Sequence, residues 1–360
     1  MTMKRRALLL AEDFRLPYRV LRCASSCCEE VYVLGTAGSS KLRMSNACVR
    51  YISIGGSYQE FGDGEVSYIN SLCEEWQIDC ILPSCPMTTR FLALFGGALK
   101  SAHYPVPTAV VFDLLDDKGR FADLCSELGV PRPDTRRVSA VEDLRQMVSE
   151  NRFAYPFIIK PANLWGSAGV KKISCNDDLP DRIDYSPIIV QQYIYGHEIC
   201  AFFLCDNGDI KASVQYSRDA SRSTFVHEPE IERYARVIIK HLMCSGVVGF
   251  DVRRDAQGGF YFIECNPRFW YRMHFAAFAG LNFVNAGLSS ANDIVVNTQA
   301  TSGIMVQGYR DLLRCMLMPW RMTDYDVAHL RYLMADPIPT IAAAIEKMTK
   351  PSRAANGSLF

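Results

Sequence analysis

The chain has 360 residues, of which 49% are hydrophobic and 22% charged, as in an ordinary globular protein. Its 39 basic and 39 acidic residues cancel, which gives no support for nucleic acid as the main partner. No run approaches the roughly 18 apolar residues of a membrane helix, and the apolar run after Lys4-Arg5-Arg6 is too short for a signal sequence. Fourteen cysteines spread along the chain indicate reduced, mostly buried thiols and a cytoplasmic protein.

The first 112 residues alternate between strand and helix patterns, which predicts a parallel sheet. No Gly-x-Gly-x-x-Gly sequence follows the first strand, so a dinucleotide is not indicated. Glu12 and Asp13 lie just beyond that strand, where ligands bind in such sheets. Three roles are compatible with this position: the two acids bind a substrate amine, they face solvent, or they cap the next helix. The predicted strands are 5–11, 31–34, 49–54 and 79–83, and the predicted helices are 14–29 and 65–76.

A lysine and a glycine-containing loop stand together further along the chain. A short buried-type strand ends at Lys160, whose backbone is predicted to be extended because Pro161 follows. Gly166, Ser167 and Gly169 come next, and glycines let backbone N–H groups surround an anion. The spacing is not that of a Walker A sequence. The pattern therefore fits a phosphate clamp, but it also fits an ordinary glycine-rich hairpin.

Two strand-like segments joined by a turn predict a β-hairpin with acids on one face. If the turn is centred on Gln257 and Gly258, Asp251 lies directly opposite Glu264, where like charges repel. Asn266 points to the same face as Glu264, and oxygens of this kind suit a divalent cation such as Mg2+ or Mn2+. A surface hairpin with scattered acids is the alternative. The predicted strands cover 247–254 and 259–266 and follow a helix over about 229–244.

Two further segments, Asp116-Asp-Lys-Gly-Arg-Phe121 and Val190-Gln-Gln-Tyr-Ile-Tyr-Gly-His-Glu198, complete an order of motifs. Over about 113–285 this order resembles the ATP-grasp superfamily of carboxylate–amine ligases. The resemblance implies that nucleotide is bound by Lys118, Lys160, the loop residues Gly166, Ser167 and Gly169, the hinge residues Gln191, Gln192 and Ile194, and the ribose-binding Glu198. It implies that Mg2+ or Mn2+ is held by Asp251, Glu264 and Asn266, and that Lys160 and Arg268 are the catalytic cations.

The chain departs from the family pattern at three places. Gln191 stands where relatives often have glutamate, and Cys265 stands where an aliphatic residue is frequent. After Arg268 the chain continues with the bulky sequence Phe269-Trp-Tyr-Arg-Met-His274. The acceptor of a relative therefore cannot simply be transferred to this chain.

The implied fold is α/β, with a Rossmann-like parallel-sheet domain over 1–112 and a two-lobed α+β ATP-grasp domain. Its small lobe covers 113–190, its large lobe with the metal hairpin covers 191–300, and a helical extension over 301–360 carries helices over 308–348. The implied function is an ATP-dependent ligase that joins a small-molecule carboxylate to an amine through an acyl phosphate and releases ADP and phosphate. A kinase or other phosphoryl transferase and a non-catalytic nucleotide-binding module are the alternatives. A glycan-linked or lipid-linked acceptor and a homodimer stay open.

Overall fold

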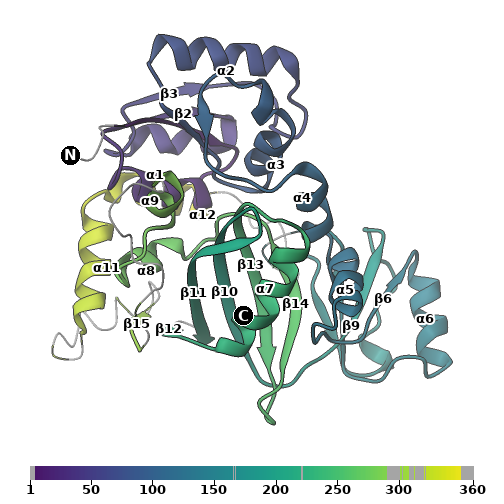
Figure 1. The fold of residues 1–360 in the computed structure, drawn as a ribbon. Helices are drawn as coiled ribbons and strands as arrows, with labels where there is room; N and C mark the ends of the chain where they lie inside the picture. The colour runs from purple at the N-terminus through teal and green to yellow at the C-terminus, as the bar shows by residue number, and fades with distance from the viewer. Residues whose placement is uncertain are drawn as a thin grey trace.

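Three sheets organise the molecule, which the computed structural model describes at residues 5–164, 166, 168–219, 222–289, 301, 303–307, 312, 320 and 322–349. Figure 1 shows a parallel sheet at the top, a large antiparallel sheet at the centre and a smaller sheet at the right. The predicted α/β fold class is therefore confirmed. Within the described part of the chain, no helix has the length and apolar character that crossing a membrane requires.

The N-terminal domain is a five-stranded parallel sheet in the order β3-β2-β1-β4-β5, as the alternating pattern predicts. In its central strand every side chain from Ala7 to Ala11 is fully buried, because helices cover both faces. The first helix ends at Ala24 and not at residue 29, because the hydroxyls of Ser25 and Ser26 bond back to backbone carbonyls and compete with the helix. The elements are β1 Arg6–Ala11, α1 Arg15–Ala24, β2 Glu30–Gly35, η1 Ala37–Met44, β3 Arg50–Ser53, α2 Asp63–Glu75, β4 Cys80–Leu82, α3 Pro86–Phe95, η2 Gly96–Ala98 and β5 Ala102–His103.

The small lobe is a four-stranded antiparallel sheet in the order β6-β9-β7-β8. Helix α4 (Ala109–Asp116) leads into it from the N-terminal domain, and helix α6 packs its apolar residues against the sheet around Phe157. The elements are α5 Lys118–Glu127, β6 Thr135–Val138, α6 Val141–Ser149, β7 Phe157–Pro161, β8 Lys171–Ile173, η3 Asn176–Asp178 and β9 Ile188–Gln192.

The large lobe is a six-stranded antiparallel sheet in the order β14-β13-β10-β11-β12-β15. One face packs against α5 and α7, and the other shares a core with the N-terminal domain. The bulky residues after Arg268 belong to this second core, where Trp270 stacks on Phe202 and Phe269 contacts Tyr104. The elements are β10 His197–Asp206, β11 Asp209–Asp219, β12 Arg222–Val226, α7 Pro229–His241, β13 Gly246–Arg254, β14 Phe260–Asn266, α8 Met273–Phe278, α9 Phe283–Leu288 and β15 Met305–Gln307.

The C-terminal segment contains the helices α11 (Asp324–Met334) and α12 (Pro337–Thr349). They confirm the C-terminal part of the helical prediction over 308–348, whereas 308–311, 313–319 and 321 lie outside the described residues. Asp336 separates the two helices and is buried against the N-terminal domain, where its carboxylate accepts hydrogen bonds from Ser45 Oγ at 2.5 Å and Asn46 N at 3.2 Å. The extension therefore folds back onto the first domain.

Cysteine burial follows the prediction in most of the described chain. Cys80, Cys200 and Cys205 are buried within the strands where the apolar pattern places them. Cys175 is exposed, contrary to the expectation, because it lies just past the end of β8 at the start of a short 3-10 helix.

Candidate nucleotide and metal site

The acidic hairpin pairs Asp251 with Glu264, as predicted, although the register arises in a different way. Next to the turn Arg254 pairs with Phe260, so the loop is not the even-numbered one assumed from the sequence. A β-bulge at Ile263 adds one residue to β14 and restores Asp251 opposite Glu264. The turn itself is held by Asp255, whose carboxylate oxygen accepts from the backbone N–H groups of residues 257 and 259 at 3.0 and 2.7 Å.

The bulge also links the two lobes. Ile263 has no partner opposite it on β13, and its carbonyl accepts hydrogen bonds from Lys160 Nζ at 3.3 Å and from Gln191 Nε2 at 3.4 Å. Both donors belong to the small-lobe sheet. The bulge is therefore the point where the lysine of β7 meets the acidic hairpin.

The two predicted nucleotide lysines converge on Glu264. Lys118 stands at the start of α5 with 6% exposure, and its Nζ lies 2.9 Å from Leu164 O and 3.9 Å from Glu264 Oε2. Lys160 has 4% exposure, and its Nζ donates to Gln191 Oε1 at 2.9 Å. Burial lowers the pKa of Lys160 to about 8, although the charge of Glu264 opposes this shift. Two buried cations thus face one carboxylate.

The facing acids share an environment that suits a divalent cation. Burial, together with the charges of Glu264 and Glu198, raises the pKa of Asp251 well above its ordinary value. Burial by itself raises the pKa of Glu264 too, but the charges of Lys118 and Lys160 outweigh burial and hold it below its ordinary value. A cation between Asp251 and Glu264 would relieve the repulsion that otherwise favours a proton there, so this donor set fits Mg2+ or Mn2+.

Asn266 lies beside the two acids but presents its nitrogen to them. Its Nδ2 lies 3.3 Å from Asp251 Oδ2 and 3.4 Å from Glu264 Oε1, while its Oδ1 accepts from a guanidinium nitrogen of Arg268 at 2.7 Å. The predicted ligand oxygen of Asn266 therefore faces Arg268, and the amide has to turn before it can coordinate a metal with the acids.

The predicted hinge connects the two sheets. Strand β9 ends at Gln192 and β10 begins at His197, so the chain crosses between the lobes here, with Ile194 buried and Gln192 Oε1 accepting from Asp134 N at 3.3 Å. Gln191 is 4% exposed, and its amide oxygen holds Lys160. This contact was not predicted from the sequence. Strand pairing contained the signal, because Lys160 is paired with Ile189, two residues from Gln191 on the same face.

Glu198 lies on the same face of the large sheet as the acidic hairpin. Its Oε1 accepts from Arg218 at 3.1 Å, and the ligand atoms of Glu198, Cys200 and Asp251 lie within 4.8 Å of one another. Cys200 and Arg218 were not predicted as site residues. The alternation of β10 could have identified Cys200, since it is two residues from Glu198 and pairs with Asp251 across the strands.

The loop after Lys160 contains two glycines with left-handed backbone conformations. Gly166 has φ +67° and Gly169 has φ +72°, a region that favours glycine, and both residues are exposed. Ser167 lies outside the described residues. The loop is tied to the first lysine, because Leu164 O is the acceptor for Lys118 Nζ.

The N-terminal domain reaches the site through the end of its first strand. Asp13 caps α1 by accepting from Arg15 N at 2.9 Å, which confirms the capping alternative, and burial raises its pKa while the charges of Arg15 and Arg268 lower it. Glu12 Oε2 accepts from Tyr58 N at 2.9 Å and so holds the loop before α2. Both acids therefore have structural hydrogen bonds.

The geometry defines a two-lobed fold with a candidate cation site where the lobes meet. Residues 184–311 match a family model described as "ATP-grasp in the biosynthetic pathway with Ter operon". The large chain of carbamoyl phosphate synthase from Lachnoclostridium phytofermentans is 28% identical over 182 residues, covering 43% of this chain and 16% of that protein. The arginine-specific large chain from Geobacillus stearothermophilus is 26% identical, covering 58% and 22%. The chain thus spans only about a fifth or less of these curated relatives.

Solved structures of low sequence identity share the fold. N5-carboxyaminoimidazole synthetase from Staphylococcus aureus, complexed with ADP, matches with a TM-score of 0.68 and 15% identity over 88% of this chain and 87% of that one. L-amino acid ligase from Bacillus licheniformis matches with a TM-score of 0.62 and 16% identity over 79% and 73%. Together with the family model, these matches confirm the predicted resemblance to the ATP-grasp superfamily.

Proposed function

We propose that the protein is an ATP-dependent ligase that joins a small-molecule carboxylate to an amine. The observation that carries the proposal is the convergence of the buried Lys118 and Lys160 on the facing acids Asp251 and Glu264. Such a concentration of charge is suited to the phosphates of a nucleotide and their metal ion. Support also comes from the similar structures, which include a synthetase with ADP, a carboxylase domain with MgADP and an L-amino acid ligase.

The chemistry requires an activated carboxylate, because oxide is too poor a leaving group for direct amide formation. Transfer of the γ-phosphoryl group from ATP to the carboxylate gives an acyl phosphate and ADP, and attack by the amine then releases phosphate. We assign Lys118, Lys160 and the Gly166–Gly169 loop to the phosphates, Gln191 to Ile194 to adenine, and Glu198 to ribose. Arg268, which lies next to Asn266, would bind the carboxylate or neutralise its phosphate.

Asp251 and Glu264 would hold Mg2+ or Mn2+, with Asn266 joining them once its amide turns. When bound, the cation neutralises charge on the β- and γ-phosphates. Burial raises the pKa of Asp251 and the two lysines lower that of Glu264, which supports a site that gains from an added positive charge. The residues of this chain therefore provide the position and the counter-charges, and no side-chain nucleophile is needed.

The direct test is hydroxylamine trapping with the full chain, ATP, Mg2+ and a panel of carboxylates. A ligase yields ADP, phosphate and a hydroxamate with its cognate carboxylate. A phosphate ester without hydroxamate would identify a kinase instead. Release of AMP and pyrophosphate would contradict the acyl-phosphate route, and ATP binding without stimulated turnover by any substrate pair would favour a non-catalytic module.

A further inference from the structure

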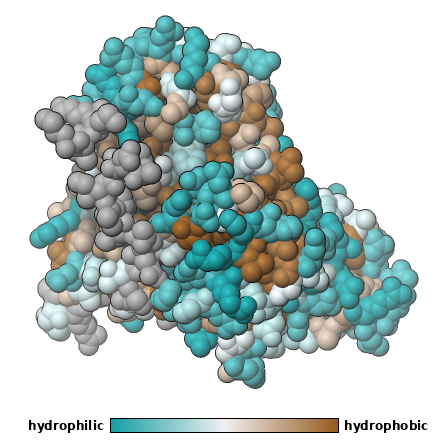
Figure 2. All heavy atoms as spheres, in the orientation of Figure 1, coloured by the Kyte–Doolittle hydropathy of each residue, from teal (hydrophilic) through white to brown (hydrophobic). Residues whose placement is uncertain are grey.

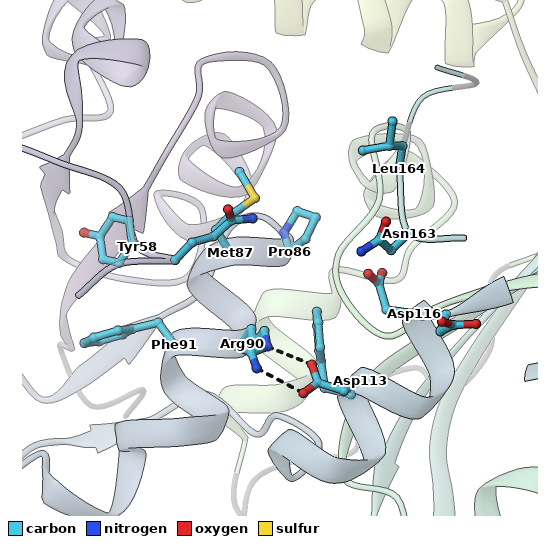
Figure 3. A pocket seen from close by; sticks show the side chains of 12 residues that line it. Tyr58, Pro86, Met87, Arg90, Phe91, Asp113, Asp116, Asn163 and Leu164 are labelled. Carbon is cyan, nitrogen blue, oxygen red and sulfur yellow. Dashed lines mark hydrogen bonds and ion pairs between the residues drawn. The ribbon is translucent and has the colours of Figure 1, made fainter. Parts of the chain in front are cut away.

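A cavity of about 740 Å3 lies between the N-terminal domain and the small lobe. Its walls come from the loop before α2, from α3, from the α4–α5 junction and from the segment that follows β7 (Figure 3). This volume is typical of a small-molecule pocket. On the outer surface, Figure 2 shows apolar residues gathered where the N-terminal domain meets the lobes below it.

One wall of the cavity carries three acids with different surroundings. Asp113 is paired with Arg90 by two hydrogen bonds of 2.7 and 3.0 Å, and Asp117 caps α5 by accepting from the N–H groups of residues 119 and 120. Asp116 points into the cavity beside Asn163 (Figure 3). Because Asp116 ends α4, which has no basic residue in its last turn, the negative end of the helix adds to its charge. This wall attracts a cation.

The opposite wall is mainly apolar, although Gln59 and Arg90 also belong to it. Pro86, Met87 and Phe91 of α3 line it, and Tyr58 packs edge-on against Phe91 with ring centroids 5.5 Å apart. Tyr58 is fixed in place, because its hydroxyl donates to Leu34 O and its backbone N–H donates to Glu12. A preformed aromatic and aliphatic surface of this kind accepts the hydrocarbon part of a ligand without large rearrangement.

The cavity adjoins the nucleotide site through one short segment. Asn163 and Leu164 line the cavity, and Leu164 O accepts the hydrogen bond from Lys118 Nζ. Lys118 itself follows the cavity residue Asp117 in the chain and faces Glu264 on its other side. The cavity thus adjoins a charge cluster formed by Lys118, Lys160, Asp251 and Glu264. The Lys118 side chain and its acceptor, Leu164 O, lie between a ligand in the cavity and the rest of this cluster.

We propose that this cavity binds the amine substrate, and that this substrate is a cationic amine with an apolar body. The ammonium group lies at Asp116 and Asn163, and the hydrocarbon part lies against Tyr58, Met87 and Phe91. The ligand's role as a substrate rests on the proposed ligase function. The binding chemistry rests on the cavity alone, so the two can be tested separately.

The test measures binding of small probes to the full chain by calorimetric titration, without ATP. Three cationic probes (2-phenylethylamine, tryptamine and 3-methylbutylamine) are compared with the neutral 2-phenylethanol and the anionic 3-phenylpropionate. We expect at least one cationic probe to bind about tenfold more tightly than both the neutral and the anionic probe. Asp116→Asn should remove most of that preference. Asp123→Asn, which makes the same charge change at an exposed pair with Arg137, should not.

Several results would overturn the inference. They are no binding by any cationic probe, equal binding of cationic and neutral probes, or equal losses in the two variants. The comparison of probes on the unaltered chain decides the matter even if a variant fails to fold. If cationic probes bind as expected but no carboxylate yields a hydroxamate, the ligase proposal fails while the cavity assignment stands. If hydroxamate forms but no cationic probe binds, the cavity assignment fails and the ligase proposal stands.

Discussion

The charge cluster around Glu264 and the cavity beside Asp116 are adjacent but are built in opposite ways. In the cluster, strand register places three of the four charged groups: β13 sets Asp251 opposite Glu264, and β7 carries Lys160 to the bulge carbonyl of Ile263, while Lys118 comes from the start of α5. In the cavity, four separate segments meet, and none is placed by strand pairing with another. One region is held by backbone geometry, and the other by the packing of two domains.

The different construction of the charge cluster and the cavity suits them to different roles. The cluster offers buried lysines and half-buried acids, whose charges match a phosphate–metal group. The cavity offers one acidic wall and one mainly apolar wall, both formed by the packing of helices and loops. We therefore expect changes in the cluster to affect ATP use and changes in the cavity to affect which amine is accepted. The contact between Lys118 and Leu164 O joins the two regions.

The largest expected effect comes from Glu264→Gln. The amide cannot offer the second negative charge that a cation between Asp251 and residue 264 requires, and it leaves Lys118 and Lys160 without their shared counter-charge. ATP turnover, measured as ADP release, should fall by about a thousandfold. Binding of 2-phenylethylamine should change by less than about threefold, since the cavity lies on the other side of Lys118. Turnover within tenfold of the unaltered chain would contradict the assignment of the metal site.

The next largest effect is expected from Lys160→Ala. This change removes a buried ammonium group that we assign to phosphate, so ATP affinity should fall by about 30- to 100-fold. Lys211→Ala is the control, because Lys211 is an exposed cation paired with Asp206 at 3.9 Å. Titration with a fluorescent ATP analogue measures both. Equal affinities in the two variants would remove Lys160 from the nucleotide site.

The pKa of Lys160, lowered by burial to about 8, predicts a pH dependence for ATP binding. The ammonium form is lost as pH rises through about 8, so affinity should fall between pH 7 and 9, and Lys160→Ala should lack this fall. Glu264 and Asp251 favour the charged form and Lys118 opposes it. The effect on folding stability has the opposite sign. Between pH about 8 and 10.5 the Lys160 side chain keeps its proton in the unfolded chain and loses it in the folded chain, so the free energy of unfolding rises with pH. A flat binding profile would contradict the clamp role.

The sequence predicted the cluster more completely than the cavity for a physical reason. Asp251, Glu264 and Lys160 lie on strands, where alternation and pairing restrict the geometry, so their convergence follows from short-range rules. Even there, the bulge at Ile263 was not predicted, because its position depends on turn chemistry at Asp255 and on donors from another lobe. The cavity depends on how α3 packs against α4, a tertiary contact that leaves no periodic pattern in the chain.

In the hinge, Gln191 is a second example of a contact that depends on how separate strands pack together. The departure of Gln191 from glutamate was visible in the sequence, but the partners of its side chain were not. The structure shows the amide oxygen accepting from Lys160 and the amide nitrogen donating to Thr135 Oγ1 at 3.1 Å. Three small-lobe strands meet at this point, and their relative positions are a property of the folded sheet.

The smallest expected effect comes from Arg90→Gln. Arg90 neutralises Asp113 across the domain junction, with both side chains about 40% exposed. Its removal makes the cavity more negative, so cationic probes should bind about two- to fivefold more tightly at low salt. The gain should shrink at 0.5 M salt, because screening weakens exposed charges. Arg136→Gln, at an exposed pair with Asp134, is the matched control and should change nothing measurable. Weaker binding of cationic probes in Arg90→Gln would mean that the ion pair shapes the cavity and that its acidic wall does not select the ligand.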